Sequence, residues 1–270
     1  MSRQLAALPI ALLAVSSLAA CATTGDGSSS QAAADAAHGA PQGARPIDRR
    51  AREQVAREDA LTQMAFWAAE YQTFPNDLEA AQQFAEALRK GGRTDRSVQI
   101  AGEALSRFPE DRKLLTTYGY AQITLNRPQQ AVRPLAMVAA AEPENWRIRS
   151  ALGAALDQVG RFNEARQAYQ EALALQPNNP RILTNMGVSH ILSGEPAEAE
   201  PILRQAVAQA GAPAEARQNL AIAVALQGRF DEAEQIERVD LPPAQAAQNI
   251  QYLRGLLSDP RRWNDMGRGR

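Results

Sequence analysis

The sequence has 270 residues, of which 45% are hydrophobic but only 5% aromatic, a composition typical of helical proteins with a core built from Ala and Leu. Lysine and arginine (29) nearly balance aspartate and glutamate (30), and no basic stripe is present, which argues against a nucleic-acid-binding protein. The only cysteine, Cys21, and the only histidines, His38 and His190, exclude a disulfide, a Cys-rich zinc site and a Cys/His nucleophilic pair on a folded domain.

The N-terminal segment, 1–20, has the pattern of an export signal. Arg3 precedes an uncharged, Leu/Ala-rich run from residue 5 to residue 20, which is too short for a membrane span. The run ends in Leu18-Ala19-Ala20-Cys21, which resembles the lipobox of bacterial lipoproteins; the alternative is an ordinary cleavage site that happens to precede a cysteine. The resemblance implies that residues 1–20 are a lipoprotein signal peptide and that Cys21 carries a covalent lipid. We expect no other cofactor and no metal.

The residues after Cys21 predict where the anchor lies and how the folded part is attached to it. Ala22 stands where an aspartate would resemble an inner-membrane retention signal. This resemblance implies anchoring on the outer membrane, facing the periplasm. Residues 21–47 are rich in Ser, Gly, Ala and Gln without an apolar period, so they predict a flexible tether.

A 34-residue period runs through the rest of the chain and predicts repeated helical hairpins. Proline ends one helix before the next begins, glycine or asparagine accepts a left-handed turn, and small residues let two helices approach closely. The three series are Pro75, Pro109, Pro143 and Pro177 with Gly211; Gly92, Asn126, Gly160, Gly194 and Gly228; and Ala85, Gly119, Gly153, Gly187 and Ala221, answered by Ser97, Ala131, Ala165, Ala199 and Ala233. In the clearest unit the two facing apolar stripes are Ile148, Leu152, Ala155, Val159 and Phe162, Ala165, Tyr169, Ala172.

This pattern resembles the tetratricopeptide repeat family at its signature positions. The resemblance implies an all-α fold, a right-handed superhelical solenoid of helical hairpins with about five repeats and a capping helix. The repeat array covers 78–237, with units at 78–111, 112–145, 146–179, 180–213 and, more weakly, 214–237. In the last unit Glu237 replaces a large apolar residue, so its second helix is expected to be shifted or shortened.

Both ends of the array are expected to carry additional elements, because stacked hairpins need caps. Residues 48–77 are predicted to form one N-terminal helix or a degenerate repeat. Within the C-terminal cap, residues 238–258, we predict a helix from Ala244 to Leu257 that places Ile250, Leu253 and Leu257 on one face. Residues 259–270 are predicted to be a disordered tail.

The first helices of such repeats line a concave face, which in repeat proteins holds extended or helical peptides. The family's groove positions correspond here to a basic edge, an apolar set and three hydroxyls: Lys113, Arg147, Arg181; Tyr120, Ile123, Val188, Ile191; and Thr116, Ser150, Thr184. A basic-rimmed apolar groove suits an acidic or C-terminal peptide. The alternative is that the apolar members pack between adjacent repeats and the basic ones are solvated helix ends. His190 is interpreted as a packing residue, because no acid/base partner can be named for it, and no catalytic residue is predicted.

The C-terminal part of the array resembles one particular family. Residues 219–234, followed by Asp240-Leu241-Pro242-Pro243 and Asn249-Ile250-Gln251-Tyr252-Leu253-Arg254, resemble TadD, the tetratricopeptide lipoproteins of the tight-adherence (Flp, type IVc) pilus assembly system. This implies a scaffold or pilotin-like role, with the outer-membrane secretin or another pilus component as the protein partner. An adaptor for a periplasmic protease or an outer-membrane assembly machine is the alternative. An enzyme is not expected, because no remaining stretch is long enough for a catalytic domain.

Overall fold

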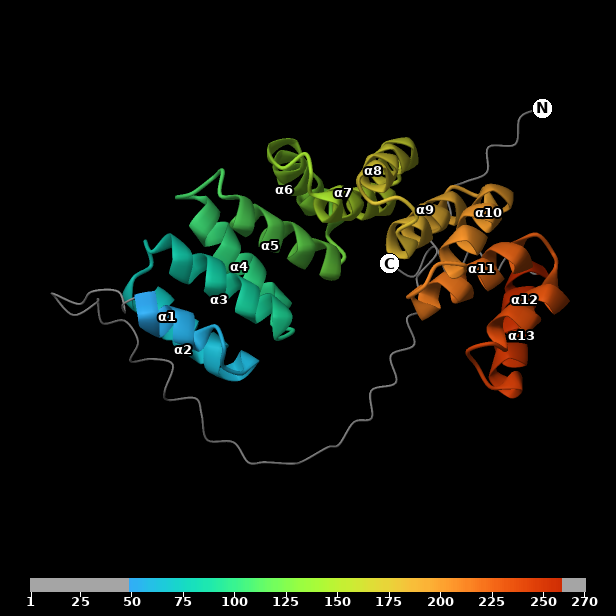
Figure 1. The fold of residues 1–270 in the computed structure, drawn as a ribbon, viewed down its shortest axis with the longest axis horizontal. Helices are drawn as coiled ribbons and strands as arrows, with labels where there is room; N and C mark the ends of the chain where they lie inside the picture. The colour runs from blue at the N-terminus through green and yellow to red at the C-terminus, as the bar shows by residue number, and fades with distance from the viewer. Residues whose placement is uncertain (1–48, 259–270) are drawn as a thin grey trace. The chain divides into compact units, whose positions relative to one another are not determined.

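The computed structural model describes residues 49–258, and every regular element in this range is an α-helix (Figure 1). The predicted signal peptide (1–20), Cys21, the tether (21–47) and the tail (259–270) lie outside the described residues. The helices are α1 (Arg49–Val55), α2 (Ala60–Thr73), α3 (Leu78–Lys90), α4 (Thr94–Leu105), α5 (Arg112–Thr124), α6 (Pro128–Ala141), α7 (Trp146–Gln158), α8 (Phe162–Leu175), α9 (Pro180–Leu192), α10 (Pro196–Val207), α11 (Ala214–Leu226), α12 (Phe230–Glu237) and α13 (Pro243–Ser258).

The helices recur along the chain at the same 34-residue interval as the sequence pattern. The first helices of successive hairpins begin at residues 78, 112, 146, 180 and 214, and the second helices begin at residues 60, 94, 128, 162, 196 and 230. The turn inside each hairpin carries a residue with φ between 55° and 82°, which is the left-handed region that glycine and asparagine tolerate best. These residues are Gly92, Asn126, Gly160, Gly194 and Gly228, as predicted.

The described residues form two compact units, 49–121 and 122–258, and the boundary falls inside α5. The core of the unit 49–121 contains Trp67 and Tyr71 of α2, Phe84 and Leu88 of α3, and Ile100 of α4. Because α2 begins at residue 60 and α4 at residue 94, they are equivalent helices one repeat apart. The described residues of the segment 48–77 therefore hold α1 and a full-length second helix of the same hairpin pattern, α2.

In the unit 122–258 two glycines allow the helices of a hairpin to pack closely. A Cβ added to Gly153 of α7 would lie 2.6 Å from the Tyr169 ring of α8. A Cβ added to Gly187 of α9 would lie 2.5 Å from the Leu203 side chain of α10. Both distances are far below van der Waals contact, so the prediction that small residues occur at close helix approaches is confirmed here. The helix facing each glycine fills the space with a large side chain.

The C-terminal end of the unit differs from the regular hairpins. α12 has 8 residues, whereas α8 has 14, so the shortened second helix expected in the last repeat is present. Glu237, the last residue of α12, is buried, and the Asn249 side-chain amide of α13 donates a hydrogen bond of 3.0 Å to its carboxylate. Burial raises the pKa of this carboxyl above its usual value, although the hydrogen bond from Asn249 opposes the shift.

The predicted apolar face of α13 is correct for Ile250 and Leu253 but wrong for Leu257. Ile250 is buried and Leu253 packs on the same core, whereas Leu257 is 38% exposed and Leu256 is buried instead. α13 has 16 residues, twice the length of α12, and Arg254 already lies over the ring of Phe230 at the start of α12. The last turn of α13 therefore extends beyond α12, and Leu257 has no part of that helix to pack against.

Candidate functional site

The first helices of three successive hairpins, α7, α9 and α11, pack side by side in the unit 122–258. Positions one repeat apart are equivalent on these helices. Ala154, Val188 and Ile222 occupy one such position, and each is partly exposed. We call these three residues the apolar row. Leu192 of α9 and Leu226 of α11 are also partly exposed, so a half-buried apolar surface crosses from α7 to α11.

Two exposed arginines lie on the same helices as the apolar row. Arg147 and Arg181 are the second residues of α7 and α9. Within residues 49–258 neither forms an ion pair with a carboxylate, and Arg147 lies over the neighbouring Trp146 ring at 4.5 Å. Because helix N-termini carry partial positive charge, these cations and the helix ends together attract anions. Arg147 and Trp146 also line a shallow depression of about 490 Å³ at the turn between α6 and α7.

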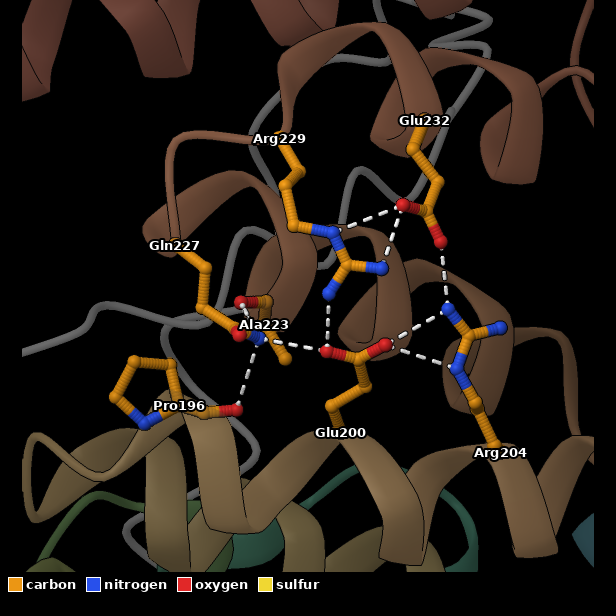
Figure 2. Close-up of polar contacts among 7 residues, drawn as sticks. All are labelled: Pro196, Glu200, Arg204, Ala223, Gln227, Arg229 and Glu232. Carbon is orange, nitrogen blue, oxygen red and sulfur yellow. Dashed lines mark hydrogen bonds and ion pairs between the residues drawn. The ribbon is translucent and has the colours of Figure 1, made fainter.

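An ion-pair network, which we call the Glu200 clamp, joins α10 to α11 and α12 (Figure 2). Glu200 accepts hydrogen bonds from Arg204 at 2.7 Å and from Arg229 at 2.6 Å, and Glu232 accepts hydrogen bonds of 2.6 Å from both arginines. The side-chain amide of Gln227, at the end of α11, donates to Glu200 at 2.8 Å. Gln227 thus links the C-terminal end of α11 to α10.

Of the two carboxylates in the clamp, that of Glu200 is the more deeply buried. Burial favours the neutral acid, but the hydrogen bonds from Arg204, Gln227 and Arg229 outweigh it and lower the pKa of Glu200 to about 2. Glu200 is therefore charged at neutral pH, and its contacts are charge-assisted hydrogen bonds.

A second polar cluster connects α7 to α8 and α9 inside the core. Asp157 is buried, and its carboxylate accepts hydrogen bonds from the Tyr169 hydroxyl at 2.9 Å and the Ser189 hydroxyl at 2.6 Å. Burial outweighs these two hydrogen bonds and raises the pKa of Asp157 to about 6. Because all three side chains are buried and link two neighbouring hairpins, we interpret the cluster as structural.

Comparison with protein families identifies the hairpins. A family described as tetratricopeptide repeat matches residues 124–186, 158–211 and 190–258, which together span half of the 270-residue chain. The chain belongs to the tetratricopeptide repeat family. A comparison with curated proteins finds no match.

Solved structures with the same fold include several of MamA. MamA MSR-1 is 28% identical, with a TM-score of 0.53 over 58% of this chain and 89% of that chain. MamA AMB-1 is 27% identical, with a TM-score of 0.53 over 58% of this chain and 93% of that chain. MamA from Desulfovibrio magneticus RS-1 is 20% identical, with a TM-score of 0.54 over 58% and 89% of the two chains, and this likeness shows the fold alone.

The groove residues predicted from the tetratricopeptide resemblance fall into two groups in the structure. Arg147 and Arg181 are exposed, and Val188 and Ile123 are partly exposed, in the unit 122–258. Ser150, Thr184 and Ile191 are buried: Asn185 donates a hydrogen bond of 3.2 Å to the Ser150 hydroxyl, Thr184 donates one of 2.7 Å to the Pro180 carbonyl, and Ile191 joins a core cluster. In the unit 49–121, Lys113 is exposed and Thr116 and Tyr120 are partly exposed. Peptide binding by these residues stays a prediction.

His190 packs at the C-terminal end of α9, next to the tetratricopeptide turn. Its Nδ1 lies 2.8 Å from a carboxylate oxygen of Glu195, and the same oxygen accepts a hydrogen bond of 3.0 Å from the Ser193 hydroxyl. Ser193 also donates to the His190 backbone carbonyl, so its hydroxyl contacts the carboxylate and the backbone, not the imidazole. This arrangement is not that of a Ser-His-acid triad, in which the histidine takes the proton of the serine.

Sequence reasoning missed three residues of these tetratricopeptide hairpins. Ala154 and Ile222 were not among the predicted groove residues, although the repeat period identifies both from Val188. Asp157 stands at a repeat position that the neighbouring units fill with Ile123 and Ile191, and this single charge was the signal of its buried cluster. Within residues 49–258, no helix is long and apolar enough to cross a membrane, and no three His, Cys, Asp or Glu residues are placed to hold a metal ion.

Proposed function

We propose that this tetratricopeptide protein is a binding scaffold whose α7/α9/α11 face holds an acidic peptide segment of a partner protein. The observation that carries the proposal is that the apolar row runs over α7, α9 and α11, and that α7 and α9 also carry Arg147 and Arg181. The guanidinium groups of these arginines form no ion pair with a carboxylate of residues 49–258. Apolar side chains of the peptide would cover the row. Its carboxylates would bind the two arginines.

The two parts of the face serve different purposes in this proposal. Burial of partly exposed Val188 and Ile222 supplies affinity, at roughly 25 cal/mol for each Å² of apolar surface removed from water. Arginine binds carboxylate in a bidentate, directional manner, so Arg147 and Arg181 select for acidic segments and fix their register. Ion pairs on an exposed face are screened by salt, so binding is expected to weaken as ionic strength rises.

A pull-down from detergent-solubilised membranes, read by mass spectrometry, tests this proposal. The wild-type chain is compared with the double variant Arg147→Ala/Arg181→Ala and with Val188→Asp. The control is Arg161→Ala, since Arg161 is an exposed arginine at the start of a second helix, α8, and pairs with Glu164. The same partner should be recovered with wild type and control, and lost or strongly reduced with both other variants. Equal recovery with all four proteins would refute the proposed face.

We further propose that the scaffold is anchored by a lipid on Cys21 to the periplasmic face of the outer membrane. The lipobox-like sequence Leu18-Ala19-Ala20-Cys21 supports this. The resemblance of residues 219–254 to TadD supports a pilotin-like role, in which the partner is a secretin or another pilus component. A tether between anchor and groove makes the second contact intramolecular at roughly millimolar effective concentration, so a modest peptide affinity suffices.

Membrane fractionation of a Cys21→Ser variant tests the anchor. The variant is expected to be soluble in the periplasm and to leave the secretin mislocalised. A variant that still fractionates with the outer membrane would contradict the lipid anchor. Recovery of a periplasmic protease or an outer-membrane assembly protein in the pull-down would replace the secretin as the proposed partner.

A further inference from the structure

A buried arginine docks α1 onto the unit 49–121. Arg52 is the one residue of this seven-residue helix that is buried. Its guanidinium donates hydrogen bonds to Glu70 at 2.7 Å, to Asp77 at 2.6 Å and to Glu79 at 2.7 Å. The guanidinium carbon lies 5.5 Å from the centroid of the Trp67 ring. We call Trp67, Glu70, Asp77 and Glu79 the arginine pocket.

The walls of the arginine pocket come from α2 and α3, not from α1. Trp67 and Glu70 are buried residues of α2, and Trp67 belongs to the core of this unit. Asp77 caps the N-terminus of α3, where its side chain accepts the Ala80 backbone N–H at 2.9 Å, and Glu79 lies in the first turn of that helix. Trp67 and Asp77 are therefore held by contacts within α2 and α3, in the core and at the helix cap, and not by α1 alone.

The negative charge of the arginine pocket is stable only when a cation is bound to it. Three carboxylates surround one guanidinium, and the side chains of Glu70 and Asp77 are only 4% and 16% exposed. Buried carboxylates without a cation are strongly destabilising, so an empty pocket is an unfavourable state. A guanidinium suits the site better than an ammonium, because its planar fork reaches several carboxylates at once while one face lies on the Trp67 ring.

The docking of α1 through Arg52 is weak. Among the described residues of α1, only the Arg52 side chain is buried, so the docking of α1 depends chiefly on this one side chain. The buried Nε of Arg52 has no hydrogen-bond acceptor, so α1 does not use the full hydrogen-bonding capacity of the guanidinium. Arg49 on the same helix is exposed and pairs only locally, with Glu53.

From these contacts we propose that the arginine pocket is a guanidinium-binding site that α1 occupies reversibly, and that an arginine-bearing segment of a partner protein takes its place. The site differs from the α7/α9/α11 face in its chemistry, because it is acidic and selects basic segments. Binding of such a segment releases α1. The pocket is lined by three carboxylates, which favours segments that carry further positive charge.

Binding of a synthetic peptide with the sequence of residues 49–57 to the full-length Arg52→Ala chain tests this inference. The variant empties the pocket, and calorimetry together with the NMR signal of the Trp67 indole reports its refilling. We expect saturable binding, with at least a tenfold weaker affinity for the wild-type chain, in which α1 competes. A peptide in which lysine replaces the arginine equivalent to Arg52 should bind at least tenfold more weakly than the parent peptide.

The control chain is Arg49→Ala, which removes an exposed arginine of the same helix and should bind the peptide as weakly as wild type does. Absence of peptide binding to a folded Arg52→Ala chain would overturn the inference, as would equal binding of the lysine peptide. Amide hydrogen exchange on the wild-type chain gives a test that does not depend on the folding of the variant. Saturating peptide should accelerate exchange in α1 but not in α3; unchanged α1 exchange would also overturn the inference.

Discussion

Gly153 and Tyr169 form the contact whose removal is expected to be most informative about the hairpin packing. Tyr169 is 1% exposed, and its ring occupies the space that a side chain at position 153 would need. Gly153→Ala therefore forces the ring away from a distance of 2.6 Å, and overpacking of this kind costs about 1–3 kcal/mol of unfolding free energy. Tyr169→Ala creates a cavity and removes a donor from Asp157, so we expect a loss of about 3–5 kcal/mol.

The two substitutions are expected to couple with a change of sign. When the ring is absent, Gly153→Ala meets no obstacle and gains helix propensity, which stabilises a helix interior by up to about 1 kcal/mol. The same substitution should thus be destabilising in the wild-type chain and stabilising in the Tyr169→Ala chain. The difference, about 2–4 kcal/mol, is the interaction free energy of the double-mutant cycle.

Urea unfolding followed by circular dichroism measures all four free energies. The matched control is Gly255→Ala in α13, because a Cβ at Gly255 has no neighbour within 4 Å and the substitution should be neutral or slightly stabilising. If Gly153→Ala has the same effect with and without the Tyr169 ring, the ring does not fill the gap above the glycine. The close helix approach would then need another explanation.

Two buried carboxylates should give opposite pH dependences of stability. Because the pKa of Asp157 is raised to about 6, the contribution of Asp157 to the unfolding free energy should be full below pH ~4 and fall by about 2–3 kcal/mol as pH rises through 6. Asp157→Asn should remove this fall in urea titrations, and an unchanged slope would contradict the burial argument. Because the pKa of Glu200 is lowered to about 2, the Glu200 clamp should stabilise fully above pH ~4.5 and be lost as pH falls through 2. Glu200→Gln should remove about 1–2 kcal/mol at pH 7, after solvent screening of the half-exposed arginines, and less at pH 3. Thermal unfolding at the two pH values checks this; no loss at pH 7, or an equal loss at both, would refute the role of the clamp.

The hairpins were predictable from the sequence because their determinants are local and repeated. A left-handed turn residue and a small residue at a helix crossing each determine the structure of a short stretch of chain. Because both recur in successive repeats, the sequence shows each pattern several times. Gly160 and Gly153 illustrate this: each has an equivalent at the next unit, Gly194 and Gly187, in the same structural role. Where the period weakened, at Glu237, the expected shortening of the helix followed.

The polar clusters were not predictable as wholes, because their contacts join different helices and only single pairs recur with the repeat, such as Arg161–Glu164 and Arg229–Glu232. Arg52 contacts Glu70 and Asp77, 18 and 25 residues away, which belong to α2 and to the N-terminal cap of α3, so no pattern within one helix indicates these contacts. In a sequence with 22% charged residues, nothing distinguishes this arginine from its solvated neighbours. The exposure of Leu257 was also not predictable from local sequence, because it depends on the length of α12 and not on the apolar spacing of α13.

The near-zero net charge argued against nucleic acid as a partner, but it is compatible with the two proposed binding sites, which differ in the sign of their charge. Arg147 and Arg181 are exposed, so an acidic peptide that binds them should respond to salt over a screening length of about 8 Å at physiological ionic strength. The Arg52 guanidinium is buried among carboxylates and lies on an aromatic ring, where salt screens little. Raising ionic strength should therefore release a partner from the α7/α9/α11 face, while the arginine pocket keeps its occupant. The reason is that mobile ions cannot reach the carboxylates that stabilise a buried guanidinium.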